Sequence, residues 1–112
     1  MLSAVDRAKF RVKIKSLADE ARTIRAEEKR AKTEFDRNTL YLHRIGIVRK
    51  EQRATLLAYA MARGVPYKVA EPKTRKIIDF KRVRGILNSL AGIEMTQDDV
   101  REWVDSATTK CV

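Results

Sequence analysis

The sequence is poor in the residues that build disulfides and metal sites, with one cysteine and one histidine among 112 residues. Cys111 is the only cysteine, so no disulfide can form within the chain, and a cysteine-based metal site is disfavoured. His43 alone cannot supply a histidine-rich metal site or a two-histidine acid–base pair. These absences predict a protein of a reducing, intracellular compartment that holds no metal.

Motifs of catalysis and long apolar segments are also missing. The sequence has no glycine-rich phosphate loop, and its serines lack the context of a nucleophile. The acidic pairs Glu27/Glu28 and Asp98/Asp99 are explained by a solvated helix face and by helix capping. No apolar run approaches the roughly 20 residues of a membrane span, and the N-terminus lacks the apolar core of a signal peptide. We therefore expect no enzymatic activity, no cofactor and no membrane partner.

Positive charge is what the sequence has in excess, with 25 Lys or Arg against 15 Asp or Glu. Residues 1–82 hold 22 of the basic residues and 10 of the acidic ones, a net charge of +12, whereas residues 83–112 carry −2. Such an asymmetry favours binding to a polyanion or to an acidic protein surface. The basic part of the chain is therefore where we expect the functional surface.

Helices are predicted throughout, because 36% of the residues are charged and only four are glycine and two proline. Residues 7–15 alternate basic with apolar or small side chains, which taken alone would suit an edge strand. The apolar seam beyond them instead continues at helical spacing, interrupted only by Glu28. We therefore predict a helix from about residue 4 to the low forties, with a bend near residues 33–38 as an option. The seam consists of Phe10, Ile14, Leu17, Ala21, Ile24, Ala31 and Phe35.

Turn and capping residues divide the rest of the chain. Gly46 predicts a turn over residues 44–48, and Gly64 marks the end of the helix that follows. Asp79 and Thr96 are placed to cap two further helices, the first ending at Gly92. We predict one all-α domain over residues 1–112, with a long basic helix and a second helix in 1–63, a connector at 64–78 and a helix pair at 79–112.

In this all-α fold the long N-terminal basic helix packs on three to four shorter helices, through a helical hairpin or a coiled-coil contact. Whether the seam is filled by the same chain or by a second copy stays open. Glu28 bears on this packing, because a buried unpaired charge is strongly unfavourable. We expect Glu28 to be solvated at the end of the packed stretch, the alternative being a basic partner that meets it.

The candidate binding residues are basic side chains that recur at helical spacing or cluster near the expected turn. Arg7, Arg11 and Lys15 are four residues apart and so share one helix face. These residues are candidates for phosphate contacts with little sequence specificity. The full set is Arg7, Arg11, Lys15, Arg44, Arg49, Lys50, Arg53, Lys73, Arg75 and Lys76.

Part of the sequence resembles known proteins of unassigned role. Residues 42–53 (LHRIGIVRKEQR) and 57–67 (LAYAMARGVPY) are similar to segments of short helical proteins encoded by tailed bacteriophages. The resemblance covers about a quarter of the chain. It implies small size, intracellular action during infection and interference with a host nucleic-acid machine, and it implies no catalytic residues.

Two functional hypotheses follow. The first is a non-enzymatic helical module that binds DNA, RNA or a ribonucleoprotein through phosphate contacts. The alternative is a protein-protein interaction factor, such as a phage-type inhibitor or a helical assembly protein, whose seam packs on a partner or on a second copy.

Overall fold

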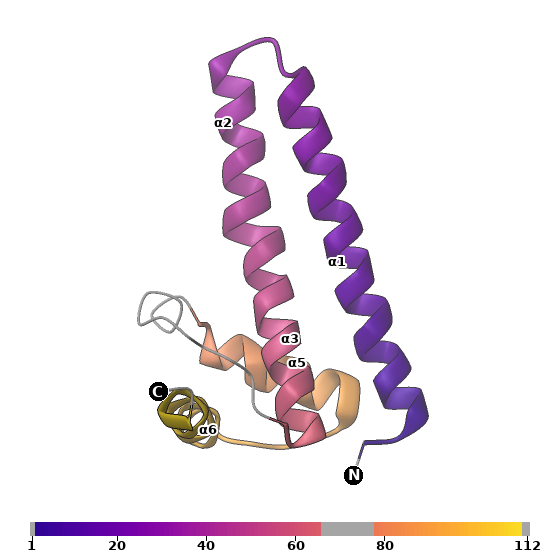
Figure 1. The fold of residues 1–112 in the computed structure, drawn as a ribbon, viewed down its shortest axis with the longest axis vertical. Helices are drawn as coiled ribbons and strands as arrows, with labels where there is room; N and C mark the ends of the chain where they lie inside the picture. The colour runs from indigo at the N-terminus through magenta and orange to yellow at the C-terminus, as the bar shows by residue number, and fades with distance from the viewer. Residues whose placement is uncertain (1, 66–77, 111–112) are drawn as a thin grey trace.

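The computed structural model describes residues 2–65 and 78–110, and these form helices with no strand among them. The elements are α1 (Ala4–Arg30), α2 (Glu34–His43), η1 (Arg44–Val48), α3 (Arg49–Arg63), α5 (Phe80–Ala91) and α6 (Gln97–Lys110). Figure 1 shows α1 lying antiparallel to α2, η1 and α3 in one long hairpin, with α5 and α6 at its base. The predicted all-α class and the helical hairpin are confirmed.

Side-chain caps fix where the helices begin. Ser3, Asp79 and Thr96 each accept a hydrogen bond from the backbone N–H three residues further on, at 3.1 Å in all three cases. At the other ends, Gly64 and Gly92 adopt left-handed backbone conformations with φ of 69° and 65°. Glycine tolerates this conformation without a Cβ clash, so it ends a helix at little cost. These predicted helix boundaries are therefore confirmed.

The first helix ends earlier than the sequence pattern predicts. α1 stops at Arg30, Ala31 is extended, and Thr33 caps the start of α2 by accepting the Asp36 N–H at 3.1 Å. The predicted continuation of one helix to the low forties is therefore wrong, because this cap begins a second helix that runs back along the first. Phe35, which was assigned to the seam, lies beyond this break and is 78% exposed.

The predicted turn at residues 44–48 is also wrong. This segment is the π-helix η1, which joins α2 to α3 in one helical rod from residue 34 to residue 63. The inward-facing residues Leu40, Arg44 and Val48 are four apart, a spacing that drifts about 40° per step around an α-helix. A wider π turn offsets this drift and keeps Arg44 and Val48 buried. Gly46 is exposed and does not have a positive φ.

Two apolar clusters hold the elements together. The larger one, at the base, joins α1, α3, α5 and α6, and it includes Phe10, Leu57, Ile86 and Val104, each at most 1% exposed. The smaller one lies higher in the hairpin and contains Ala21, Ile24 and Val48, with Leu17 and Leu40 packed against it. The seam is therefore filled by the same chain. Trp103 is half-buried and packs against the larger cluster.

Glu28 is buried, contrary to the expectation that it is solvated. Its side chain is 10% exposed, and it is paired with Arg44, whose side chain is 8% exposed. Arg44 Nε and Nη2 donate to Glu28 Oε2 and Oε1 at 2.5 Å and 3.2 Å. The charge in the seam is thus paired with a cation from η1, on the opposite side of the helical hairpin. This is the basic partner that the sequence analysis gave as the alternative.

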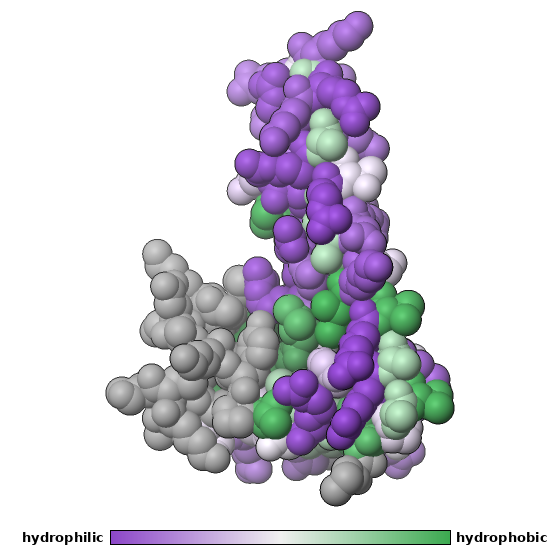
Figure 2. Space-filling model, turned by 45° about the vertical axis from the view of Figure 1, so that its right-hand side comes forward, coloured by the Kyte–Doolittle hydropathy of each residue, from purple (hydrophilic) through white to green (hydrophobic). Residues whose placement is uncertain are grey.

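The molecule is elongated, with extents of 48 × 32 × 21 Å. The space-filling view in Figure 2 shows a predominantly hydrophilic arm, while apolar surface gathers where the arm meets the base. Among the described residues, no helix has both the length and the apolar character required to cross a bilayer.

Candidate nucleic-acid interface

One face of α1 carries a row of cations. Arg7, Arg11, Lys15, Arg22 and Arg25 are all exposed. The first three are four residues apart, Arg22 follows Lys15 after seven residues, and Arg25 follows Arg22 after three. Side chains at such spacings lie above one another on a helix. The acidic residues of α1 occur at other positions of the helical repeat; they are Asp6, Asp19, Glu20, Glu27 and Glu28.

Near the base, part of this row borders a groove between α1 and α3. The groove has a volume of about 450 Å³ and an apolar interior that includes Ile14, Leu56 and Val65. Arg11 and Lys15 from α1 and Arg63 from α3 also line it. This part of the molecule therefore combines apolar surface with three cations.

Tyr59 lies in the same groove, between the core and the cations. Its ring stacks on Phe10, with centroids 5.1 Å apart and planes inclined by 19°. The Arg63 guanidinium carbon lies 4.7 Å from the centroid of the Tyr59 ring. Burial raises the pKa of Tyr59, but its hydrogen bonding with Arg63 and Arg11 outweighs this effect and lowers the pKa overall.

A second groove, of about 470 Å³, lies further along the hairpin and is lined by four arginines. Arg22 and Arg25 come from α1, while Arg44 and Arg49 come from η1 and α3. The two other lining residues are Ala18 and Ala21. Arg44 is paired with the buried Glu28, and Arg22 forms an exposed ion pair with Asp19 at 3.2 Å.

The two grooves lie along the same side of the hairpin. Their α1 residues belong to one row, and Arg49 and Arg63 are separated by about four turns of α3, which returns them to one face. Together they form what we call the cationic groove, defined by Arg11, Lys15, Arg22, Arg25, Arg44, Arg49 and Arg63. From Arg11 to Arg25 it spans about 21 Å at the helical rise. No carboxylate is among the described residues that line it.

The structure brings together some of the basic residues singled out in the sequence and separates others. Arg11, Lys15 and Arg49 line the cationic groove, and Arg7 extends its row on α1. Arg44 lines it too, but its guanidinium is committed to Glu28. Two further candidates do not line it, Lys50 and Arg53, of which the first is exposed and the second half-buried. The last three candidates, Lys73, Arg75 and Lys76, lie outside the described residues.

Other basic residues stabilise the fold. Lys13 and Arg82 both bind Glu51, at 2.9 Å for the Lys13 Nζ and 2.8 Å for the Arg82 Nε, so this carboxylate links α1, α3 and α5. The hydrogen bonds from Arg82 are the main cause of the lowered pKa of Glu51, and burial opposes them. These two cations are therefore occupied within the molecule.

Three residues of the groove were missed in the sequence, namely Arg22, Arg25 and Arg63. Arg22 and Arg25 continue the row of Arg7, Arg11 and Lys15 after one gap at Ala18, so extending the spacing would have found them. Arg63 carries no such signal, because its place beside Tyr59 and opposite Arg11 depends on how α3 packs against α1.

No family model, curated protein or solved structure matches the chain. The resemblance of residues 42–67 to phage-encoded proteins therefore stays a prediction.

Proposed function

We propose that the chain is a non-enzymatic module that binds nucleic acid along the cationic groove. The observation that carries this proposal is the run of seven Lys and Arg side chains along one side of the hairpin, with no carboxylate among the described lining residues. Arg44 is committed to Glu28, whereas Arg22 pairs with Asp19 through an exposed contact of 3.2 Å that a phosphate can displace, so six cations are counted toward the ligand. A row of that length suits a linear polyanion, because successive phosphates can each meet a cation.

Low sequence specificity follows from the chemistry of the groove. Its polar groups are charged side chains suited to phosphate, and phosphate contacts position a nucleic acid without reading its bases. The helices fix the spacing of the cations, while their exposed side chains must still be ordered when the ligand binds. We therefore expect broad binding that weakens strongly as salt is added.

A charge-reversal experiment tests this assignment. Arg22→Glu combined with Arg25→Glu should lower the affinity for a labelled oligonucleotide by at least about tenfold in fluorescence anisotropy at low salt. The matched control is Lys81→Glu with Arg84→Glu, two exposed residues of α5 outside the groove. The control has the same change in net charge, so it measures the long-range effect alone. Equal losses in the two variants would contradict the groove assignment.

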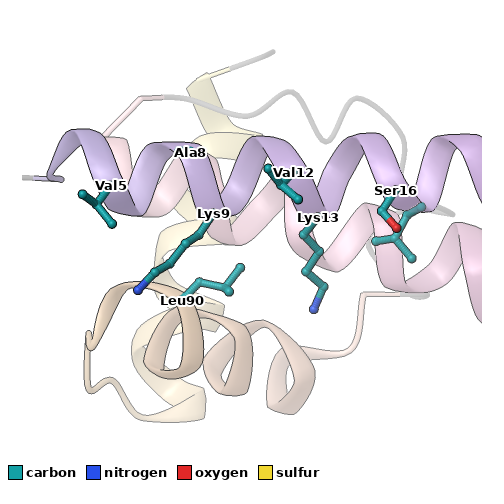
Figure 3. Close-up of a pocket in the computed structure, with 8 residues that line it drawn as sticks. Val5, Ala8, Lys9, Val12, Lys13, Ser16 and Leu90 are labelled. Carbon is teal, nitrogen blue, oxygen red and sulfur yellow. The ribbon is translucent and has the colours of Figure 1, made fainter.

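An apolar groove between α1 and α5 supports a second candidate, binding to a partner helix. Val5 and Val12 are 66% and 68% exposed there, facing Leu90 across a space of about 690 Å³. Figure 3 shows Lys9 and Lys13 extending from α1 toward α5 beside this apolar surface. Lys13 is occupied by Glu51, so it is the apolar surface that suits the apolar face of an amphipathic helix, in line with the phage-type interference that the resemblance implies.

Exposed apolar residues on the arm favour the same candidate. Phe35, Leu42 and Ile45 are 78%, 66% and 40% exposed and follow a spacing of seven and three, which places them on one face of the α2–η1 rod. Such a stripe on an isolated helix face is a known signature of helix pairing. The solution mass of the purified protein tests whether the partner helix belongs to a second copy of the chain. A dimer that becomes a monomer on Leu42→Asp supports self-association, and a monomer at all concentrations excludes it.

A further inference from the structure

Three side chains in contact lead from the core to the surface of the cationic groove. Phe10 is fully buried, its ring stacks on Tyr59, and Arg63 lies over the Tyr59 ring. Arg63 is the exposed member of the three, while Tyr59 is half-buried beneath it. A ligand in the groove therefore meets the guanidinium of Arg63 before it can reach either ring.

The position of Arg63 is fixed by the end of α3. Arg63 is the last residue of the helix, and Gly64 follows it in the left-handed conformation. The next two backbone N–H groups are used, since Gly64 donates to Met61 O and Val65 donates to Ala60 O, both at 3.0 Å. This closed helix end fixes the backbone at Arg63, and the guanidinium lies against the Tyr59 ring.

The Arg63 guanidinium is planar, and its side chain is exposed among the residues that the structure describes. Unpaired bases stack on arginine planes as well as on aromatic rings, and their phosphates pair with nearby cations. The surroundings of Arg63 meet both requirements, because the groove offers apolar surface at Ile14 and Leu56 and cations at Arg11 and Lys15. Bases within a duplex are already stacked and paired, so their faces are not available to such a platform.

We propose that Arg63 is a stacking platform for an unpaired base, so that the cationic groove takes single-stranded nucleic acid in preference to duplex. This inference rests on the proposed function and specifies its ligand. Arg22, Arg25 and Arg49 in the second groove then hold phosphates of the same strand, while the base on Arg63 sets the preference for single strands.

Arg63→Lys separates stacking from charge, because lysine keeps the positive charge but has no planar group. Binding is measured with three ligands at one low salt concentration: a single-stranded oligonucleotide, its duplex, and inorganic polyphosphate, which has no bases. The variant should lose roughly tenfold in affinity for the single strand, the effect of removing one stacking contact. Its affinity for polyphosphate should fall by no more than about twofold, since the charge is retained.

Arg84→Lys, the same substitution at an exposed site on α5, is the matched control and should bind all three ligands as the unmodified protein does. A circular dichroism melt of each variant verifies that it is folded. If Arg63→Lys weakens single-strand and polyphosphate binding equally, or weakens neither, the stacking platform is overturned while the proposed function stands. If the unmodified protein binds none of the three ligands, both proposals fail.

Discussion

The guanidinium of Arg44 in η1 donates hydrogen bonds to both carboxylate oxygens of Glu28 in α1, at 2.5 Å and 3.2 Å. The pair lies next to the cluster of Ala21, Ile24 and Val48, on the side toward the tip of the arm. Neither charge could be buried alone without a large desolvation penalty, so each one requires the other. The pair therefore fixes which turn of η1 lies against which turn of α1.

The pH dependence of stability tests this pair. The hydrogen bonds from Arg44 lower the pKa of Glu28 below its ordinary value of 4.5, against the opposing effect of burial. A lowered pKa in the folded state means that the stabilisation is present above pH 4.5 and is lost as the pH falls through the folded-state pKa. We expect Glu28→Gln to melt at a lower temperature than the unmodified protein at about pH 7, and this difference to narrow as the pH falls below 4.5.

The measurement is a series of thermal melts of the two proteins over that pH range. Glu51, whose pKa is also lowered, is present in both proteins, so its titration cancels in the difference. A difference in melting temperature that does not change with pH would show that the ionised form of Glu28 contributes nothing.

Two glycine substitutions distinguish a continuous rod from a turn at residue 46. A Cβ added at Gly46 or at Gly64 meets no atom within 4 Å, so the two sites differ in backbone conformation and not in available space. Gly46→Ala should raise the free energy of unfolding by about 0.5–1 kcal/mol, because alanine favours the helix. Gly64→Ala should lower it by about 1–2 kcal/mol, because the position has a positive φ. Urea unfolding of both variants measures these changes, and a destabilised Gly46→Ala would argue for a turn.

Two phenylalanines that fit the same sequence pattern should behave in opposite ways. Phe10 is fully buried, so Phe10→Ala should cost about 3–5 kcal/mol of unfolding free energy through lost burial and the cavity left behind. Phe35 is 78% exposed, and Phe35→Ala should change stability by no more than about 0.5 kcal/mol. Chemical denaturation of the two variants checks this, and comparable losses would mean that Phe35 is packed in the purified protein instead of being exposed to solvent.

Local chemistry made much of the fold predictable. The caps at Ser3, Asp79 and Thr96 and the glycine ends at Gly64 and Gly92 depend on residues within one helical turn, which a sequence displays directly. The break after Arg30 was missed because residues 31–33 contain neither glycine nor proline. Thr33 could serve equally as an interior helix residue or as a cap, and only the packing of the hairpin decides between them.

The groove was less predictable than the helices that form it. Helical spacing identified Arg7, Arg11 and Lys15 of the α1 row. It could not show which residues of α3 face that row, because the register of the hairpin depends on the pair of Glu28 and Arg44. The π-helix η1 shifts this register further, and no residue pattern within 44–48 predicts a π-helix. For the same reason Arg44 was counted among the ligand contacts, although it is largely buried in an ion pair.

The central claim, that the cationic groove binds the phosphates of a nucleic acid, is tested most directly by the salt dependence of binding to a single-stranded oligonucleotide. With six cations available, log Kobs should fall against log salt with a slope of about −4, a loss of several hundredfold between about 50 and about 200 mM. Arg22→Glu with Arg25→Glu should make this slope shallower by between about one and two, and Lys81→Glu with Arg84→Glu should leave it unchanged. An absence of binding at about 50 mM salt, or the same slope in all three proteins, would contradict the account.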